Sequence, residues 1–235
     1  EAYPLNPEKG PIDAYLDIPT ILKIAKDHNV DAIHPGYGFL AENPVLVEEC
    51  EKNGITFIGP TVDSMNAMGD KISSKQIAIA SQVPIIPGVD HAMKTVEEAM
   101  EVAKKVGYPV MLKASNGGGG RGIRLVSAPN EMTQAYALAV AEGEASFGDG
   151  SVYMEKYVHP ARHIEVQVLA DEAGNVVCLG ERDCSVQRHH QKLIEESPSP
   201  AVSRSQRKKL MELTARAVKA IGYVGVGTLD FLLDR

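Results

Sequence analysis

Lys113-Ala-Ser-Asn-Gly-Gly-Gly-Gly-Arg-Gly122 is the stretch that decides how the rest of the chain is interpreted. Glycine tolerates positive φ and lets main-chain N–H groups approach a ligand closely. Successive N–H groups in such a loop form a concave anion site, to which Lys113 and Arg121 add positive charge. A flexible surface loop is the alternative for a glycine-rich segment. The two cations favour an anionic ligand, and a polyphosphate is the obvious one.

The segments on either side of this loop indicate which kind of phosphate site it is. Residues 110–113 and 122–126 are both predicted strands. A dinucleotide-binding G-x-G-x-x-G loop lies between a strand and a helix, and a Walker loop ends in Gly-Lys-Ser/Thr. Neither condition is met. The loop is therefore predicted to be a hairpin lid over nucleotide phosphates, a role that glycine-rich hairpins have in kinases.

Length, composition and charge exclude several classes of protein. The 235 residues are 44% hydrophobic and 23% charged, which is ordinary for one large globular domain or two small ones. The net charge of −7 argues against a general nucleic-acid or membrane-surface role. No apolar run approaches the roughly 18 residues of a membrane helix. The three cysteines lack metal-site spacing and suggest a reducing compartment, so we expect a cytoplasmic protein, or a mitochondrial matrix protein if the source is eukaryotic.

Residues 1–60 are predicted to be an α/β subdomain with parallel strands, because helices alternate with short apolar strands. The predicted elements are a loop over 1–16, a helix from Pro19 to about His28, a strand over 31–34, a helix from Pro44 to Asn53 with Asn43 as its N-cap, and a strand over 55–58. Residues 61–84 are predicted to be connecting helices, at about 62–68 and 70–82.

Residues 85–157 are predicted to be a small α+β lid. Its elements are a helix over 95–106 with a Thr95/Glu98 capping box, strands over 110–114, 122–126 and 151–157, and a helix over 130–145. The apolar positions of this last helix recur with helical spacing; they are Met132, Ala135, Tyr136, Ala139 and Val140.

Residues 158–235 are predicted to begin a strand-rich subdomain. In residues 162–169, Ile164, Val166 and Val168 alternate with His163, Glu165 and Gln167, so one face is buried and the other is polar. Residues 175–179 and 184–194 are predicted to continue this sheet, followed by a helix over 203–221 and a strand over 226–233.

Residues 182–192 contain five arginine, histidine and lysine side chains, which is costly on a sheet unless an anion lies opposite. A zinc site from Cys184, His189 and His190 is an alternative, but its spacing fits no standard pattern. Strict alternation places His190 and Lys192 on one face and Gln187 on the other. These three residues can meet one ligand only if a bulge or bend intervenes.

Three further positions are candidate ligand contacts. Lys71 begins a predicted helix, where a cation opposes the helix dipole unless an anion is near; a solvated lysine is the alternative. Glu155 and Lys156 end the last lid strand at a domain junction, where an adenine edge could bind; an ordinary ion pair is the alternative. Asp230 is a carboxylate in an apolar strand, which suggests Mg²⁺ held together with nucleotide phosphates or a capped strand end.

Together these segments resemble the biotin carboxylase component of biotin-dependent carboxylases, an ATP-grasp family. The resemblance covers nearly the whole chain. The matching segments are residues 34–43 (HPGYGFLAEN), 57–60 (FIGP), 68–71 (MGDK), 113–122, 153–157 (YMEKY), 162–167 (RHIEVQ), 181–188 (ERDCSVQR) and 190–192 (HQK). Residues 10–17 (GPIDAYLD) look most like the pyruvate carboxylase branch.

The resemblance implies an ATP-grasp fold and a set of residue roles. Lys71 and Lys113 would contact ATP phosphates under the loop that includes Gly117, Gly118, Gly119, Gly120 and Gly122. Glu155, Lys156 and the Val158 backbone would hold adenine. His163, Gln187 and His190 would line the ribose and phosphate region. Lys192 would lie at the bicarbonate, and Asp230 would be a ligand of Mg²⁺ (or Mn²⁺).

The implied reaction forms carboxyphosphate from ATP and bicarbonate and transfers CO₂ to a biotin nitrogen. The biotin would be carried on a biotin carboxyl carrier domain, a carboxyltransferase component would use it, and the full-length protein would be a homo-oligomer. Lysine, arginine and histidine would concentrate at the site because ATP and bicarbonate are both anionic. A closing lid would keep water from the intermediate.

The chain also departs from the family pattern. Asp230 replaces the usual Glu, and His189 stands where arginine is more usual. The family's first strand and glycine loop are expected before Glu1, and its second Mg²⁺ carboxylate, biotin-facing arginines and general base after Arg235. We therefore expect a partial domain, with a fold incomplete at both ends, that is inactive alone. The alternatives are another ATP-grasp ligase, such as a carbamoyl-phosphate synthetase-like enzyme, and a non-catalytic nucleotide-binding fragment.

Overall fold

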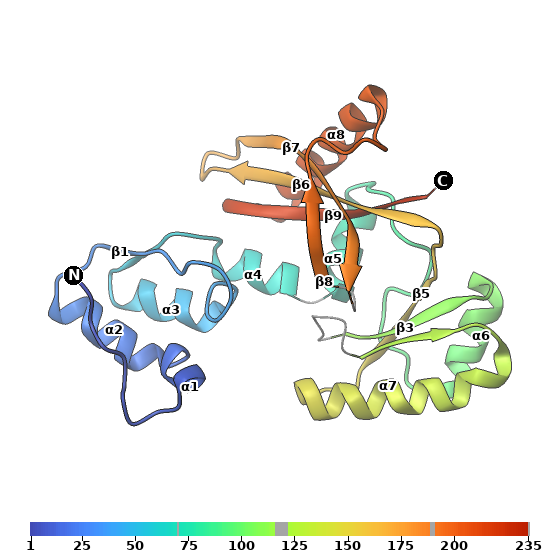
Figure 1. The fold of residues 1–235 in the computed structure, drawn as a ribbon, viewed down its shortest axis with the longest axis horizontal. Helices are drawn as coiled ribbons and strands as arrows, with labels where there is room; N and C mark the ends of the chain where they lie inside the picture. The colour runs from blue at the N-terminus through green and yellow to red at the C-terminus, as the bar shows by residue number, and fades with distance from the viewer. Residues whose placement is uncertain (70, 116–121, 189–190, 235) are drawn as a thin grey trace.

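The computed structural model describes residues 1–69, 71–115, 122–188 and 191–234. Within these ranges the strands form three separate sheets, one in each successive part of the chain (Figure 1). The first has two strands, the second has three in the order β4-β3-β5, and the third has four in the order β8-β7-β6-β9. The predicted site residues that lie on strands belong to the second and third sheets.

The first sheet confirms the prediction of parallel strands in the N-terminal part. Helices α1 (Pro11–Tyr15) and α2 (Ile18–Asp27) precede β1 (Ala32–Ile33), and α3 (Pro44–Lys52) precedes β2 (Thr56–Phe57). The strands β1 and β2 pair in parallel. The side chain of Asn43 accepts a hydrogen bond from the Val45 N–H at 2.9 Å, so it is the N-cap that was predicted. The prediction of a loop over 1–16 was wrong at α1, a helix of 5 residues that is too short to show apolar periodicity.

Two helices connect this part to the rest: α4 (Val62–Gly69) and α5 (Lys71–Ala80). The chain after α5 packs against α8 (Arg204–Ile221), where Val83 contacts Leu213 and Ala217 in a small buried cluster. Arg216 of α8 also donates to the carbonyls of Ser81 and Gln82 at 3.4 Å. The C-terminal end of α5 is therefore attached to the C-terminal part of the chain.

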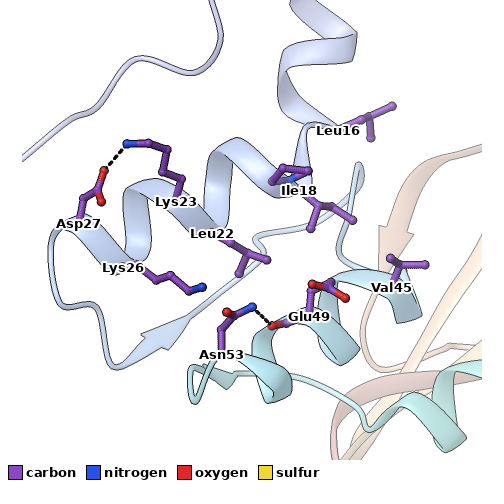
Figure 2. A pocket seen from close by; sticks show the side chains of 10 residues that line it. Leu16, Ile18, Leu22, Lys23, Lys26, Asp27, Val45, Glu49 and Asn53 are labelled. Carbon is purple, nitrogen blue, oxygen red and sulfur yellow. Dashed lines mark hydrogen bonds and ion pairs between the residues drawn. The ribbon is translucent and has the colours of Figure 1, made fainter.

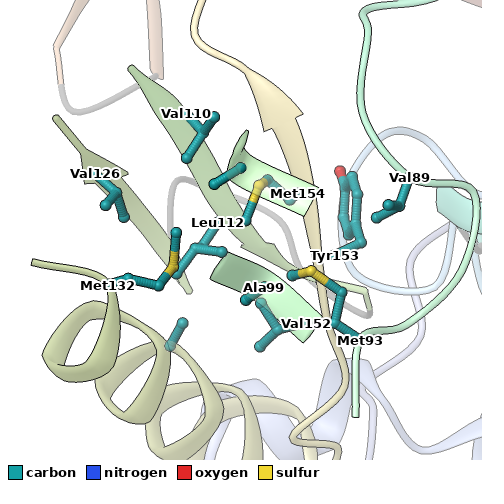
Figure 3. Close-up of a cluster of buried hydrophobic side chains, with 12 residues drawn as sticks. Val89, Met93, Ala99, Val110, Leu112, Val126, Met132, Val152, Tyr153 and Met154 are labelled. Carbon is teal, nitrogen blue, oxygen red and sulfur yellow. The ribbon is translucent and has the colours of Figure 1, made fainter. Parts of the chain in front are cut away.

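The second sheet and its helices form the largest apolar cluster (Figure 3). Its elements are α6 (Val96–Val106), β3 (Val110–Ala114), β4 (Ile123–Val126), the 3₁₀ turn η1 (Pro129–Glu131), α7 (Met132–Phe147) and β5 (Val152–Lys156). One face of the sheet presents Val110, Leu112 and Met154 to the helices, and Met132 and Ala139 on the predicted apolar face of α7 are fully buried against it. The opposite face of the same strands presents Lys113 and Glu155.

The cap of α6 differs in detail from the prediction. Thr95 accepts from the Glu98 N–H at 3.2 Å, as an N-cap does. The carboxylate of Glu98 accepts from the Lys94 N–H at 2.7 Å rather than from Thr95, and its other oxygen lies 3.0 Å from His91. In the predicted capping box the Glu98 carboxylate would accept from the N–H of Thr95; in the structure it accepts from the N–H of the preceding residue, Lys94. Helix α8 has the complete box, between Ser203 and Gln206.

The third sheet contains β6 (Ala161–Ala170), β7 (Val176–Arg188), β8 (Gln191–Glu196) and β9 (Gly225–Asp234), all antiparallel. Ile164, Val166 and Val168 are buried on one face, as their alternation predicts. The prediction of one strand over 184–194 was wrong. Residues 176–188 form one strand, and β8 pairs back on it with Gln187 opposite Lys192. Direct cross-strand partners share a face, so Gln187 and Lys192 lie on the same side of the sheet.

Among the described residues, no helix has the length and apolar content needed to cross a membrane.

The packing of the second sheet predicts the effect of a cavity. Leu112 is fully buried on β3, whereas Leu125 on β4 is 46% exposed. Replacing Leu112 by Ala is expected to lower the free energy of unfolding by about 2–5 kcal/mol, because the removed atoms leave a cavity that close-packed neighbours cannot fill. Urea unfolding of the chain followed by circular dichroism measures this, since the chain has no tryptophan.

Leu125→Ala is the matched control, and its loss is expected to be less than about 1 kcal/mol because the side chain is already partly in water. Equal losses for the two variants would contradict the burial of Leu112 described here.

Candidate functional site

Most of the predicted site residues that the structure describes fall into two clusters, each built around a buried carboxylate; Gly122, Lys156 and Val158 lie outside them. The clusters also contain three residues that were not predicted: Lys75, Glu165 and Arg182. The Glu155 cluster comprises Lys75, Lys113 and Glu155. The second, called the Glu165 cluster, has more members; they are His163, Glu165, Arg182, Gln187, Lys192 and Asp230.

The Glu155 cluster lies on the face of the second sheet that points away from its helices. Met111 of β3 pairs with Glu155 of β5, and Lys113 is two residues further along the same face. The Lys113 Nζ donates to Glu155 Oε2 at 2.6 Å, and the Lys75 Nζ of α5 lies 3.5 Å from Oε1. Lys75 was not predicted as a site residue. Its position four residues after Lys71, on the same helical face, was a signal, because like charges at this spacing disfavour a helix unless an anion is near.

Gly122 lies just before β4 and pairs with Ala114 at the end of β3. Its φ is +68°, and its carbonyl accepts from the Ala114 N–H at 2.9 Å. A Cβ at this position would lie 2.7 Å from the Cβ of Ala114, closer than real contacts allow. Gly122 is therefore required both by conformation and by space. The predicted phosphate-binding residues Gly117, Gly118, Gly119 and Gly120 lie outside the described residues, as does the side chain of Lys71.

The predicted adenine-binding segment is held by backbone contacts. The Lys156 N–H donates to the Pro87 carbonyl at 2.7 Å, and its Nζ donates to the carbonyls of Gly107 and Tyr108 at 2.9 Å. The ammonium group of Lys156 is thus already bound by backbone carbonyls of the same subdomain. Val158 follows β5 and is half-buried. What this segment presents to a ligand is its backbone rather than the Lys156 ammonium group.

The Glu165 cluster lies on the polar face of the third sheet. Glu165 of β6 is the cross-strand partner of Arg182 on β7 and of Asp230 on β9. Its Oε1 accepts from Arg182 Nε at 2.6 Å and from an Nη of the same group, and its Oε2 accepts from Lys192 Nζ. The Lys192 Nζ also lies 3.3 Å from Asp230 Oδ1. Glu165 is only 5% exposed and both of its oxygens are taken by cations.

His163 and Gln187 have defined orientations in this cluster. The Gln187 Nε2 donates to the Cys184 carbonyl at 2.8 Å, which identifies it as the nitrogen of the amide. The same atom lies 2.6 Å from His163 Nδ1, so Nδ1 accepts and the ring proton is on Nε2. The His163 Nε2 is 3.1 Å from Asp230 Oδ1. Gln187 thereby sets the tautomer of His163.

The electrostatics of this cluster favour its charged forms. Burial would lower the pKa of Lys192, but Glu165 and Asp230 outweigh it and raise this pKa above the ordinary value. Burial would likewise raise the pKa of Asp230, but His163 and Lys192 lower it below the ordinary value. Lys192 is therefore a cation and Asp230 an anion at neutral pH. His190, which was predicted to join them, lies outside the described residues.

Among the described residues, the three groups that could form a metal site around Cys184 are poorly suited to it, whereas His189 and His190 lie outside this part of the chain. One ligand atom each of Glu165, Cys184 and Glu195 lie within 4.8 Å of one another. Both oxygens of Glu165 are bound by cations, and burial raises the pKa of the Cys184 thiol to about 11, with the charge of Glu165 as a second cause. A protonated thiol and a neutralised carboxylate are poor metal ligands.

An open groove elsewhere in the molecule lies between α2 and α3 (Figure 2). It is lined by Leu16, Ile18 and Leu22, with an exposed ion pair at its rim between Lys23 and Asp27 at 2.5 Å. None of the predicted site residues lines this groove. It presents no cluster of groups like the two described above.

The third sheet is anchored behind the Glu165 cluster by two further buried carboxylates. Glu181 and Asp183 of β7 point to the face opposite Arg182. Arg207 Nε of α8 donates to both oxygens of Glu181 at 2.8 Å, and the Ser199 hydroxyl donates to Asp183 at 3.0 Å. These bonds attach α8 and the turn before it to the strand that carries Arg182 and Gln187.

The comparisons with known proteins agree along the whole chain. Residues 1–65 match the family described as biotin carboxylase, N-terminal domain, and residues 70–235 match the family described as carbamoyl-phosphate synthase L chain, ATP binding domain. Biotin carboxylase 1, chloroplastic, from Populus trichocarpa is 51% identical over 94% of this chain, which covers 42% of that protein. The curated relatives include both biotin carboxylases and pyruvate carboxylases.

Solved structures give the same result. A crystal structure of a biotin carboxylase-beta-gamma-ATP complex from Campylobacter jejuni is similar with a TM-score of 0.93 and 52% identity, over 95% of this chain and 50% of that chain. The biotin carboxylase domain dimer of the Hydrogenobacter thermophilus 2-oxoglutarate carboxylase, solved with MgADP, ADP and bicarbonate, has a TM-score of 0.92 and 48% identity, over 96% of this chain and 50% of that chain. The chain spans about half the length of these proteins or less.

The pair of Glu181 and Arg207 predicts a pH dependence. Burial would raise the pKa of Glu181, but Arg207 lowers it below the ordinary value of about 4.3. The unfolded state then binds more protons in acid, so the contribution of this carboxylate to stability is present above the unfolded pKa and is lost as the pH falls through the folded pKa. We expect Glu181→Gln to be less stable than the wild type near neutral pH, with a difference that shrinks from about pH 6 to about pH 3.

Denaturant unfolding of the chain across this range measures the difference, with the exposed Glu212→Gln on α8 as the control. A constant difference between wild type and Glu181→Gln at every pH would contradict the role of the charge.

Proposed function

Because this chain belongs to the biotin carboxylase family of ATP-grasp proteins, we propose that the protein carrying it uses ATP and bicarbonate to carboxylate biotin on a carrier domain. The observation that supports this most is the Glu165 cluster, in which Lys192, His163 and Gln187 meet on one face of the third sheet. These residues come from three different strands, and the fold brings them together on one polar face. Similarity to structures solved with adenine nucleotides and bicarbonate supports the same substrates.

Lys113 and the glycine loop are assigned to the phosphates of ATP. Lys113 lies at the start of the loop and is 24% exposed at its side chain, so it can reach a ligand. Lys71, Gly117, Gly118, Gly119, Gly120 and Gly122 share this role. Glu155, Lys156 and Val158 are assigned to adenine. Their backbone is the part that can do this, because the side chains of Glu155 and Lys156 are engaged on the protein.

Lys192 is assigned to bicarbonate, with His163, Gln187 and His190 at the ribose and phosphates. A bicarbonate oxygen attacks the γ-phosphorus, ADP leaves, and carboxyphosphate forms. Carboxyphosphate divides into CO₂ and phosphate, the released phosphate takes the proton of the biotin nitrogen, and that nitrogen bonds to the CO₂ carbon. The cation of Lys192 would orient bicarbonate and stabilise charge that develops during the attack.

Asp230 fits one position of a magnesium site. Mg²⁺ bound with nucleotide usually takes one or two carboxylates together with phosphate oxygens and water. Asp230 is half-exposed and offers an oxygen, although His163 and Lys192 both lie close to its Oδ1. Glu165 cannot supply a second carboxylate because Arg182 and Lys192 occupy it. A bound Mg²⁺ or Mn²⁺ would neutralise charge on the phosphates.

The other parts of the proposal concern the whole protein. A biotin carboxyl carrier domain, a carboxyltransferase component and a homo-oligomer follow from the family assignment. We propose that the chain divides into four parts: an N-terminal α/β subdomain over 1–60, connecting helices over 61–84, a lid over 85–157 and the start of a strand-rich subdomain over 158–235. The three cysteines are free, which supports a reducing location such as the cytoplasm or the mitochondrial matrix. The acceptor of the carboxyl group is not specified by residues of this chain.

Lys113→Met tests the nucleotide site in the complete protein that carries this chain. We expect binding of MgATP, measured by calorimetry, to weaken by roughly tenfold or more, because a charge-assisted contact to phosphate is lost. Adenosine should bind as it does to the wild type. The control is Lys104→Met, which removes an exposed lysine on α6. Unchanged MgATP affinity in Lys113→Met would refute the assignment of Lys113.

Lys192→Met tests the bicarbonate site. ADP formation that depends on both biotin and bicarbonate is expected to fall by roughly 10²–10³-fold, the usual effect of removing a group that stabilises developing charge. MgATP affinity should change little, because the contact is to the second substrate. Biotin-independent activity with another acceptor, together with no loss in Lys192→Met, would favour a different ATP-grasp ligase.

A further inference from the structure

The ammonium group of Lys75 is buried, and its partner among the described residues is the carboxylate of Glu155. Its side chain is 6% exposed, and within the described part of the chain its Nζ makes no hydrogen bond. The nearest carboxylate oxygen is Glu155 Oε1 at 3.5 Å, an ion-pair distance. Burial lowers the pKa of Lys75, and Glu155 is the main group opposing that shift. Burying a lysine ammonium group with only a distant ion-pair partner costs free energy, so its presence here requires a compensating role.

The carboxylate beside it already has a partner. Lys113 Nζ donates to Glu155 Oε2 at 2.6 Å, so one carboxylate is shared by two lysines. The backbone around Glu155 is fixed, because Lys156 N–H donates to the Pro87 carbonyl, and a Cβ at Gly88 would lie 2.2 Å from the Met154 carbonyl. Glu155 therefore cannot move away to follow either lysine by a shift of its strand.

The two lysines differ in what they can reach. Lys113 is on β3 beside the glycine-rich connection, and its side chain is four times as exposed as that of Lys75, 24% against 6%. A ligand can draw Lys113 away from Glu155. Without a second cation that movement would leave a carboxylate of 12% exposure unpaired, which is strongly unfavourable in a poorly solvated site.

We propose that Lys75 is a positioning residue that keeps Glu155 paired when Lys113 leaves it for the phosphates of a nucleotide. Lys75 does not touch the nucleotide. It makes the release of Lys113 possible, so it acts on phosphate binding and not on adenosine binding. This inference rests on the proposed function, because it takes the phosphate ligand of Lys113 from it.

Calorimetry on the complete protein with MgATP and with adenosine tests this role. Lys75→Met keeps the apolar stem and removes the charge. We expect MgATP affinity to fall by roughly tenfold and adenosine affinity to change by less than about twofold. Lys75→Arg should restore MgATP binding, because it returns the cation. Lys104→Met is the matched surface control, and melting temperatures verify that each variant is folded.

A double-mutant cycle supplies the decisive comparison. In a Glu155→Gln background no carboxylate needs a counterion, so Lys75→Met should no longer weaken MgATP binding relative to Glu155→Gln alone. The same penalty in both backgrounds would overturn the proposal. Equal weakening of MgATP and adenosine by Lys75→Met would also overturn it, since a general structural defect affects both ligands.

The outcomes separate this inference from the proposed function. If Lys113→Met loses phosphate-dependent affinity while Lys75→Met binds MgATP like the wild type, the nucleotide site stands and the role of Lys75 is refuted. If the wild type binds MgATP no better than adenosine, the proposed nucleotide site fails, and the role of Lys75 fails with it.

Discussion

The structure depends on the pairing of buried carboxylates with cations. Glu155 and Glu165 are 9% and 5% exposed, and each is shared by two cationic side chains from different elements. A buried carboxylate that loses its partner is costly, whereas one that keeps a second partner is not left unpaired. With two cationic partners on each carboxylate, one cation could leave to bind an anionic ligand while the other keeps the carboxylate paired. This arrangement also explains how an acidic protein can hold several lysines and arginines close together before any ligand is present.

Helix α5 connects the two sheets on which these carboxylates lie. Lys75 in its first half pairs with Glu155 of the second sheet. The residues that follow α5 pack on α8, where Val83 contacts Leu213. Arg216 of α8 donates to the carbonyls of Ser81 and Gln82, just after the end of α5. Helix α8 is bound to β7 through Arg207 and Glu181. Helix α5 therefore links the third sheet, through α8, to the carboxylate of Glu155, which Lys75 shares with Lys113.

Much of the fold could be predicted because its signals are local. The cap at Asn43, the apolar face of α7 and the alternation in β6 depend on neighbours in sequence and were predicted correctly. The strand over 184–194 was wrong because its connection contains no glycine, proline or asparagine to mark a turn. That error also placed Gln187 and Lys192 on opposite faces. Lys75 was missed because its burial is a tertiary property, and the spacing of four residues from Lys71 was a weak local signal of it.

The motifs that carried the family resemblance include most members of the two clusters, but Lys75 and Asp230 lie outside them. The resemblance implies a metal-ligand role for Asp230 but gives none for Lys75, whose role is inferred from its surroundings. The carboxylate of Asp230 lies within 3.1–3.3 Å of His163 and Lys192, the groups assigned to phosphate and bicarbonate. If Asp230 binds a metal ion as proposed, an anion that draws the Lys192 cation away would remove neutralising charge from Asp230 and make its oxygen a better metal ligand. On this proposal, binding of the anion and binding of the metal ion would be linked through Asp230, just as phosphate binding and the pairing of Glu155 would be linked through Lys75.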